Sequence, residues 1–197
     1  MRTGLIVLAV IAIAVFGVVV WGIGIVNSLV GLDQDVAAQW AQVQNQYQRR
    51  ADLIPNLVET VKGYAAHERT VLEEVTKARA SASSIQLTPE ALADPEAMRR
   101  FQQAQNALSG ALSRLLVTVE RYPDLKANQN FIALQTQLEG TENRISNERR
   151  RYNEVVRTYN VRVQTFPQRF IAGSAGYRPK AFFEAIPDAA TPPRVKF

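Results

Sequence analysis

The chain has 197 residues, of which 47% are hydrophobic, so it is long enough to bury a core and is not expected to be disordered throughout. Its 23 Lys and Arg against 18 Asp and Glu give a formal charge of +5, less than a dedicated nucleic-acid binder usually carries. The lack of cysteine excludes disulfides, thiolate metal sites and a cysteine nucleophile.

The first thirty residues are predicted to span a membrane. No charged residue lies between Arg2 and Asp33, and residues 4–26 are apolar almost throughout. This segment exceeds the roughly 20 residues that a helix needs to cross the hydrocarbon core. The alternative, a cleaved signal peptide, would have a shorter apolar region, a stronger positive start and a clear cleavage site. We therefore expect a short N-terminus over residues 1–3 and a transmembrane helix over residues 4–28.

The charges that flank this segment favour a cytoplasmic N-terminus. Arg2 lies on the short side, whereas the other side opens with Asp33 and Asp35 and has no basic residue until Arg49. Positive charge is retained on the cytoplasmic side of membrane helices. The body of the protein would then lie outside the cytoplasm.

A coiled-coil-like spacing follows the membrane segment. Apolar residues recur in alternating steps of four and three at Val36, Trp40, Val43, Tyr47, Ile54, Leu57, Val61, Tyr64, Val71, Val75 and Ala78. Pro55 lies inside this pattern, and proline costs about 3 kcal/mol in a helix interior. Because the spacing passes Pro55 without slipping, we expect one helix over about residues 29–81, kinked at Pro55. The alternative is a break at Pro55 that leaves two antiparallel helices.

Two further helices are predicted. Thr88 and Asp94, each followed by proline, are candidate N-caps ahead of a helix that runs from about Met98 to Tyr122. Pro123 opens the last long helix, which ends at Phe166. The fold class is therefore all-α: a single transmembrane helix followed by an antiparallel up-down bundle of three to four long helices over residues 29–166.

The tail, residues 167–197, holds five of the nine prolines, which excludes a long helix there. We expect it to dock as a short helix or loop, with residues 181–186 (AFFEAI) forming either a short helix or an extended clip.

Residues that could carry chemistry are few. His67 is the only histidine, so an HExxH zinc motif and a Ser/His arrangement are excluded, and a surface histidine is expected in preference to an acid or base. Glu68, Glu73 and Glu74 could attract a cation, but adjacent helical residues point about 100° apart and do not form a tight site. We expect no catalytic residue, no metal and no cofactor.

Four charged residues fall on the apolar stripes, where an unpaired charge would be costly. We expect some of them to pair across helices in a polar core layer that fixes the register of the bundle. The layer comprises Arg50, Glu68, Gln105, Glu148 and Arg162.

The last helix is rich in arginine over residues 141–162 and could contact anionic lipid headgroups or nucleic acid. The candidates for such contacts are Arg149, Arg150, Arg151 and Arg157. The plainer alternative is a solvated face with internal ion pairs, because the tyrosines of this helix recur at core spacing and do not interleave as a stacking platform.

Long motifs of the chain resemble the LemA family of bacterial membrane-anchored proteins. They are AAQWAQVQNQYQRRADLIPNLVETVKGYAAHE at residues 37–68, YPDLKANQNFIALQTQLEGTENRISNERRRYNEVVRTYN at residues 122–160, and the FP that follows. They include Asn56, Glu59, Glu142 and Asn143, and the likeness covers nearly all of residues 29–166. GYRPKAFFE at residues 176–184 is similar to the family's ending, though more loosely.

This resemblance implies one N-terminal membrane helix and a helical bundle, with no established enzymatic activity. Some relatives act in magnetosome membrane formation, which implies a role in membrane shaping or scaffolding. The family's topology has been predicted with an outside N-terminus, opposite to the charge argument, so the orientation stays open.

We expect a non-enzymatic, single-pass scaffold or adaptor of the bacterial cell membrane and envelope, either self-assembling or membrane-shaping. Its partners would be the membrane and a second copy or an envelope protein, with no small-molecule substrate and no nucleic acid. The alternatives are an anionic-lipid or nucleic-acid binder that uses the last helix, and an enzyme with an unfamiliar site.

Overall fold

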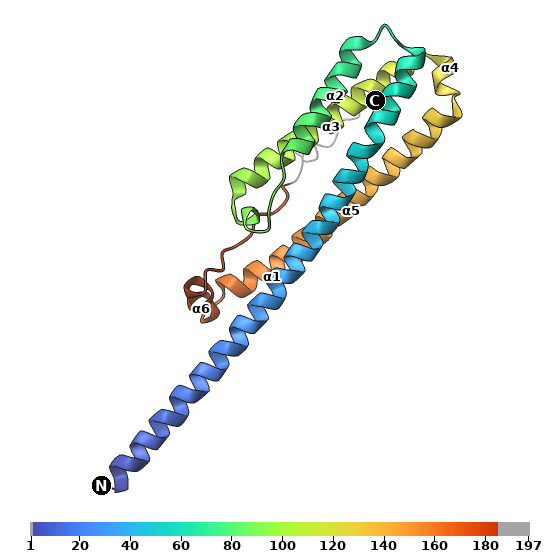
Figure 1. The fold of residues 1–197 in the computed structure, drawn as a ribbon. Coiled ribbons are helices and arrows are strands. Elements are labelled where there is room, and N and C mark those ends of the chain that lie inside the picture. The colour runs from blue at the N-terminus through green and yellow to red at the C-terminus, as the bar shows by residue number, and fades with distance from the viewer. Residues whose placement is uncertain (1, 185–197) are drawn as a thin grey trace, which may run out of the picture.

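The computed structural model describes residues 2–184. Its elements in chain order are α1 (Arg2–Tyr64), α2 (Arg69–Ser84), the 3-10 turn η1 (Ala91–Ala93), α3 (Pro95–Val119), α4 (Pro123–Lys126), α5 (Gln129–Gln164) and α6 (Gln168–Ser174). No strand occurs among the described residues. The predicted all-helical fold with one long apolar N-terminal helix is confirmed (Figure 1).

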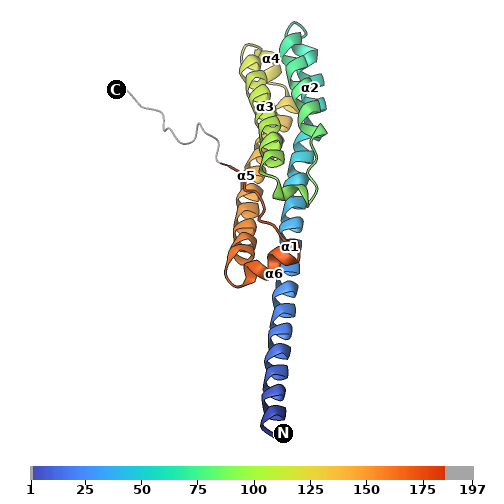
Figure 2. The same cartoon turned by 90° about the vertical axis from the view of Figure 1, so that its left-hand side faces the viewer.

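The long helices alternate in direction along one elongated body. In Figure 1, α1 rises from the N-terminus, α2 returns beside it, α3 rises again and α5 descends, with the short α4 at the far tip. The main contacts are those of α1 with α5 and of α2 with α3, and α2 also packs on α1. The first part of α1 extends alone below the body in Figures 1 and 2.

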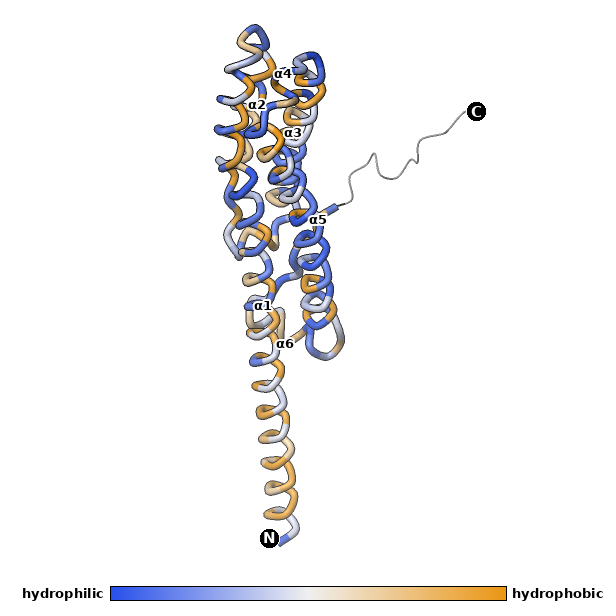
Figure 3. Tube along the Cα trace, turned by 90° about the vertical axis from the view of Figure 1, so that its right-hand side faces the viewer, coloured by the Kyte–Doolittle hydropathy of each residue, from blue (hydrophilic) through white to orange (hydrophobic). Residues whose placement is uncertain are grey.

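This extending part of α1 carries the apolar segment. Its large side chains, from Leu5 to Ile23, are all exposed, and Figure 3 shows it as an almost uninterrupted hydrophobic rod. By length and composition α1 is the one helix within residues 2–184 that could cross a membrane. No loop separates this segment from the body, because α1 is helical from Arg2 to Tyr64.

Helix α1 does not break at Pro55, and the kink expected there stays a prediction. The carbonyl oxygen of Ala51 would normally accept the N–H of residue 55, which proline lacks. Nε of Arg79 in α2 donates to this oxygen at 2.7 Å. The hydrogen bond that Pro55 removes from α1 is thus replaced by one from the neighbouring helix.

The prediction of one helix as far as residue 81 is wrong. The chain reverses at residues 65–68, where the N–H of Glu68 donates to the carbonyl oxygen of Ala65 at 3.0 Å, and α2 starts at Arg69. The reversal lies ten residues or more beyond Pro55, so the alternative of a break at Pro55 is wrong as well. The intervening segment is about one helical turn long, which is why the apolar spacing continues across it.

The later long helices begin directly after capping residues. The side chain of Asp94 accepts the N–H of Glu96 at 2.9 Å and Pro95 occupies the first position of α3, as expected. Pro123, however, opens only the four-residue α4. Helix α5 starts after Asn128, whose side chain accepts the N–H of Phe131 at 3.1 Å, so the predicted start of the last long helix is wrong.

The core has two parts. One lies near the membrane segment and includes Trp40, Phe101 and Tyr152; the other lies toward the tip and includes Leu57, Leu115 and Phe131. On α1 the first ends at Tyr47 and the second begins at Ile54. The interval between them contains Arg50.

The C-terminal part of the described chain folds back onto the body. After α6, Gly176 adopts φ +83°, a conformation that favours glycine, and the chain continues without regular structure. Residues 177–184, here called the clip, lie along α5. Of the segment 181–186, residues 181–184 have no regular secondary structure, so they form no helix, and the remaining two lie outside the described residues.

Candidate functional site

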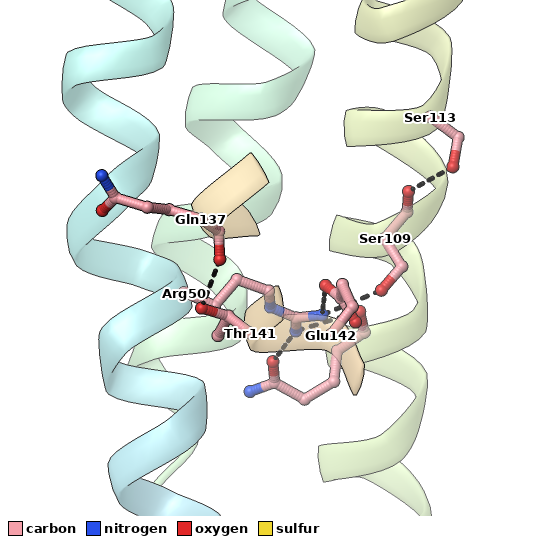
Figure 4. A network of polar contacts seen from close by, with 7 residues as sticks. Arg50, Ser109, Ser113, Gln137, Thr141 and Glu142 are labelled. Atoms are coloured by element: carbon pink, nitrogen blue, oxygen red, sulfur yellow. Dashed lines mark hydrogen bonds and ion pairs between the residues drawn. The ribbon is translucent and has the colours of Figure 1, made fainter. Parts of the chain in front are cut away.

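The most unusual residue in the body is Arg50, a charged residue that is only 1% exposed. Its Nη1 donates to Oε1 of Glu142 at 2.7 Å and to Oγ of Ser109 at 2.9 Å (Figure 4). Its Nη2 donates to Oε1 of Gln105, and the guanidinium lies 5.2 Å from the centre of the Tyr47 ring. Bonds from a charged donor are the strong ones in a protein interior, so this residue ties α1 to α3 and α5.

The network extends to the fourth long helix. Nε2 of Gln105 donates to the carbonyl oxygen of Ala82 in α2 at 3.3 Å. One connected set of polar contacts therefore touches α1, α2, α3 and α5 at a single level, between the two parts of the core. We expect such a layer to fix the register of the helices, because sliding α1 along α3 or α5 would separate the buried Arg50 charge from its acceptors.

The ion pair opens to solvent on one side. The Glu142 side chain is 39% exposed, and a groove lined by Ser109, Ser113, Ser146 and Arg149 leads to it. Burial raises the pKa of the Tyr47 hydroxyl, and the positive charges of Arg149 and Arg50 partly offset this effect.

Of the five residues predicted for a polar layer, the structure brings together Arg50 and Gln105. Glu68 lies in the reversal after α1 and accepts from Arg121 at 2.8 Å and from the Tyr122 hydroxyl at 2.9 Å. Its predicted place on a continuous helix stripe is wrong because α1 ends at Tyr64.

The other two lie elsewhere on α5. Glu148 accepts from Nε2 of Gln39 at 2.7 Å, which links α1 to α5, and from Arg151 at 3.0 Å. Nε of Arg162 is buried and has no hydrogen-bond partner; this residue lines a groove with Ser28 and Leu32 of α1. The role of all five in fixing register stays a prediction.

The candidates for anionic contacts are largely engaged within the chain. Arg149 donates to the carbonyl oxygen of Glu184 at 3.1 Å and lies 4.7 Å from the centre of the Phe183 ring. Arg150 donates to Asn147 at 3.3 Å, and Arg151 pairs with Glu148. Arg157 is exposed.

The clip is held by a contact set that we did not predict. The Asn160 side chain donates to the carbonyl oxygen of Lys180 and accepts its N–H, both at 2.8 Å. Asn153 makes the same pair of bonds with Phe183, at 3.0 and 2.9 Å. The side-chain amides thus pair with the clip backbone as a neighbouring strand would.

Two tyrosines support the same contact. The Tyr152 hydroxyl donates to the carbonyl oxygen of Ala181 at 3.2 Å, and that of Tyr159 to Arg178 at 3.0 Å. Burial raises the pKa of both hydroxyls, that of Tyr159 to about 12. The sequence signal was present: the dipeptide Tyr-Asn occurs at residues 152–153 and again seven residues later, on one face of α5.

Phe183 anchors the clip in the core. It stacks on Trp40 with ring centres 5.9 Å apart and meets Tyr152 edge-on at 5.3 Å. Trp40 in turn donates from Nε1 to the carbonyl oxygen of Leu87 at 3.1 Å. These aromatic contacts join the clip to α1, α5 and the loop after α2.

The remaining candidates are solvent-facing. His67 is exposed in the reversal between α1 and α2, and Glu73 and Glu74 are exposed on α2. No group of three or more His, Asp or Glu placed to hold a metal ion occurs within residues 2–184.

The model of the LemA family matches residues 39–197, which is four fifths of the chain and includes α2 to α6 and the part of α1 from Gln39 onward. The chain belongs to the LemA family. The LemA match and the N-terminal helix α1, which is long and apolar enough to cross a membrane, together indicate a membrane-associated protein.

Named relatives include magnetosome proteins. The chain is 25% identical to magnetosome protein MamQ 2 of Paramagnetospirillum magneticum and 27% identical to MamQ of Magnetospirillum gryphiswaldense, over 84% of this chain and 67% of each relative. It is 23% identical to protein LemA of Metamycoplasma hominis, over 83% of this chain and 70% of that protein.

Proposed function

We propose that this LemA-family chain is a non-enzymatic scaffold or adaptor, anchored in the bacterial cell membrane, that assembles with itself or with an envelope protein. The observation that carries the proposal is the continuity of α1, which joins the apolar segment to the body without a loop. At about 1.5 Å per residue, the part of α1 beyond Val26 is roughly 57 Å long. A body of this shape holds a surface at a set distance from the bilayer.

The relatives support a role in membrane organisation, because the chain is similar over 84% of its length to proteins named magnetosome proteins. The polar network supports a structural role for the body, since Arg50 and Glu142 form an ion pair between α1 and α5. We propose that the exposed face of α5, where Ile132 is 48% exposed, is available to a second copy or a partner.

The test is assembly in cells. Two differently tagged copies of the full chain are co-expressed, crosslinked in intact cells and purified through one tag. Recovery of the second tag, or of one recurrent envelope protein, is expected. Mixing lysates of singly tagged cells gives the background.

A matched pair of insertions tests the continuous helix. A Gly-Gly-Ser-Gly insert within residues 28–32 interrupts α1 next to the apolar segment. Glycine in a helix interior destabilises the helix by about 1 kcal/mol per residue. We expect the crosslinked species to disappear while the protein stays in the membrane fraction. The same insert in the loop at residues 85–90 is the control. A strictly monomeric chain that recovers no partner would refute the scaffold proposal.

A further inference from the structure

The corner between α5 and α6 exposes an aromatic pair. Phe166 is 69% and Phe170 61% exposed, although their rings meet edge-on with centres 5.9 Å apart. Phe101, Phe131 and Phe183, by contrast, are buried. The guanidinium of Arg169 lies 4.9 Å from the centre of the Phe170 ring. Adjacent exposed phenyl rings next to an arginine are typical of a surface that binds a partner with an apolar region beside a charged one.

The position of this corner along α1 indicates which partner it contacts. Helix α6 packs on α1 through Ile171 and Ala172, in the same cluster as Ile25 and Leu29. A Cβ atom added at Gly22 would lie 3.9 Å from Cδ1 of Ile171. Gly22 and Ile25 are at the body-side end of the apolar segment, so α6 lies beside the end of the membrane helix (Figures 1 and 2).

The apolar segment fixes this level relative to a bilayer. About 20 residues cross the hydrocarbon core, so with residue 4 at one boundary the other boundary lies near Ile23 to Val26. Trp21, an interfacial residue type, is 48% exposed at the same end. The exposed phenyl rings therefore lie at the height where the bilayer changes from acyl chain to headgroup.

The last turns of α5, helix α6 and the clip carry mainly positive charge at this end of the body. Between Val155 and Phe183 the sequence contains five basic residues and no acidic one. Lys180 is paired with Asp33 at 3.1 Å, and the others include Arg162 and Arg169 beside the corner. Basic side chains next to a bilayer surface are attracted by anionic headgroups.

We propose that the α5–α6 corner is a second membrane contact, in which Phe166 and Phe170 insert into the interface of an anionic bilayer and Arg162 and Arg169 lie at the level of the lipid phosphates. The proposal needs α1 to be the membrane anchor, but it does not depend on the scaffold role. A second copy that placed its own corner on this one would bring Arg162 and Arg169 of both copies together, whereas a bilayer continues the apolar surface of α1. The contact would set how the body is oriented on the membrane.

The natural absence of cysteine permits a direct test with the full chain. Single variants Phe166→Cys and Phe170→Cys are labelled with the fluorophore NBD and reconstituted in vesicles of phosphatidylcholine and phosphatidylglycerol. Val117→Cys, on a residue 71% exposed in α3, is the matched control. Circular dichroism of each variant checks that the helix content is unchanged.

We expect blue-shifted NBD emission at positions 166 and 170 that is quenched by doxyl-labelled lipid, and water-like, unquenched emission at 117. Adding Arg162→Gln and Arg169→Gln, or omitting phosphatidylglycerol, should reduce the quenching at 166 and 170. Emission at these positions equal to that at 117 would overturn the proposal. Blue-shifted emission without lipid quenching would also overturn it, because it would mean that protein and not lipid covers the corner. Neither result bears on the crosslinking of the scaffold, so the two proposals fail independently.

Discussion

Arg50 is a charge placed where burial is costly, and its surroundings satisfy it. Two of its nitrogens donate to three side chains from two other helices. Nε alone has no partner. A buried arginine is stable only when its acceptors are in position. The burial of Arg50 is therefore favourable only when α1, α3 and α5 are correctly aligned.

Arg50→Ala should therefore lower the stability of the protein sharply. Removing one partner of a buried ion pair costs about 3–5 kcal/mol, and the solvent access of Glu142 places the expected loss near the lower figure. Arg49→Ala, on the exposed neighbour, should change stability by no more than about 0.5 kcal/mol. Urea unfolding of the detergent-solubilised chains, followed by circular dichroism, measures both. Equal losses in the two variants would show that the network contributes nothing.

A second residue-scale prediction concerns the carbonyl oxygen that Pro55 leaves free. Arg79→Ala removes the donor at 2.7 Å from the Ala51 oxygen. In the Pro55→Ala background the helix can supply its own N–H, so the loss of Arg79 should matter less there. A double-mutant cycle should give a coupling free energy of about 1 kcal/mol between positions 55 and 79. Strict additivity of the two substitutions would contradict this interpretation.

At this scale the sequence could predict which residues are unusual, but not their partners. The apolar spacing placed Arg50 on a buried stripe, and it is buried. Its contacts with Ser109 and Glu142 depend on which helices become neighbours and at what height, which periodicity along one helix does not contain. Glu68 was misplaced because the reversal at residues 65–68 has no proline to mark it.

Among the elements, the clip shows how an irregular segment is fixed by a regular one. Asn153 and Asn160 lie seven residues apart on α5 and each makes two bonds to the clip backbone. This arrangement satisfies backbone groups that a helix or sheet would otherwise pair. The loop-like composition of the tail predicted the lack of a long helix, whereas the docking site was visible only as the repeated Tyr-Asn dipeptide.

The double variant Asn153→Ala and Asn160→Ala should release the clip. Each unpaired polar group left behind costs about 1–3 kcal/mol, so the clip should open while the helices remain folded. Hydrogen exchange measured by mass spectrometry should be faster at residues 177–184 and unchanged in α2. Asn143→Ala, at an exposed position of α5, is the matched control. Unaltered protection of residues 177–184 in the double variant would rule out this role for the two asparagines.

For the whole molecule, the sequence leaves the side of the membrane open. The charges that flank the apolar segment favour a cytoplasmic N-terminus, since Arg2 precedes it and Asp33 and Asp35 follow it. We therefore predict that protease added to intact spheroplasts removes a C-terminal tag and spares an N-terminal one. Resistance of the C-terminal tag until the cells are permeabilised would place the body in the cytoplasm.

The unbroken α1 also couples the body to the state of the lipid. Membrane helices tilt to match their apolar length to the bilayer thickness, commonly by about 20°. Because no loop interrupts α1 at the bilayer surface, a change of tilt there is passed to the body. For the roughly 57 Å of α1 beyond Val26, a change of about 10° displaces the tip by about 10 Å. A thinner or thicker membrane would thus reposition the far end of the protein without any change inside its fold.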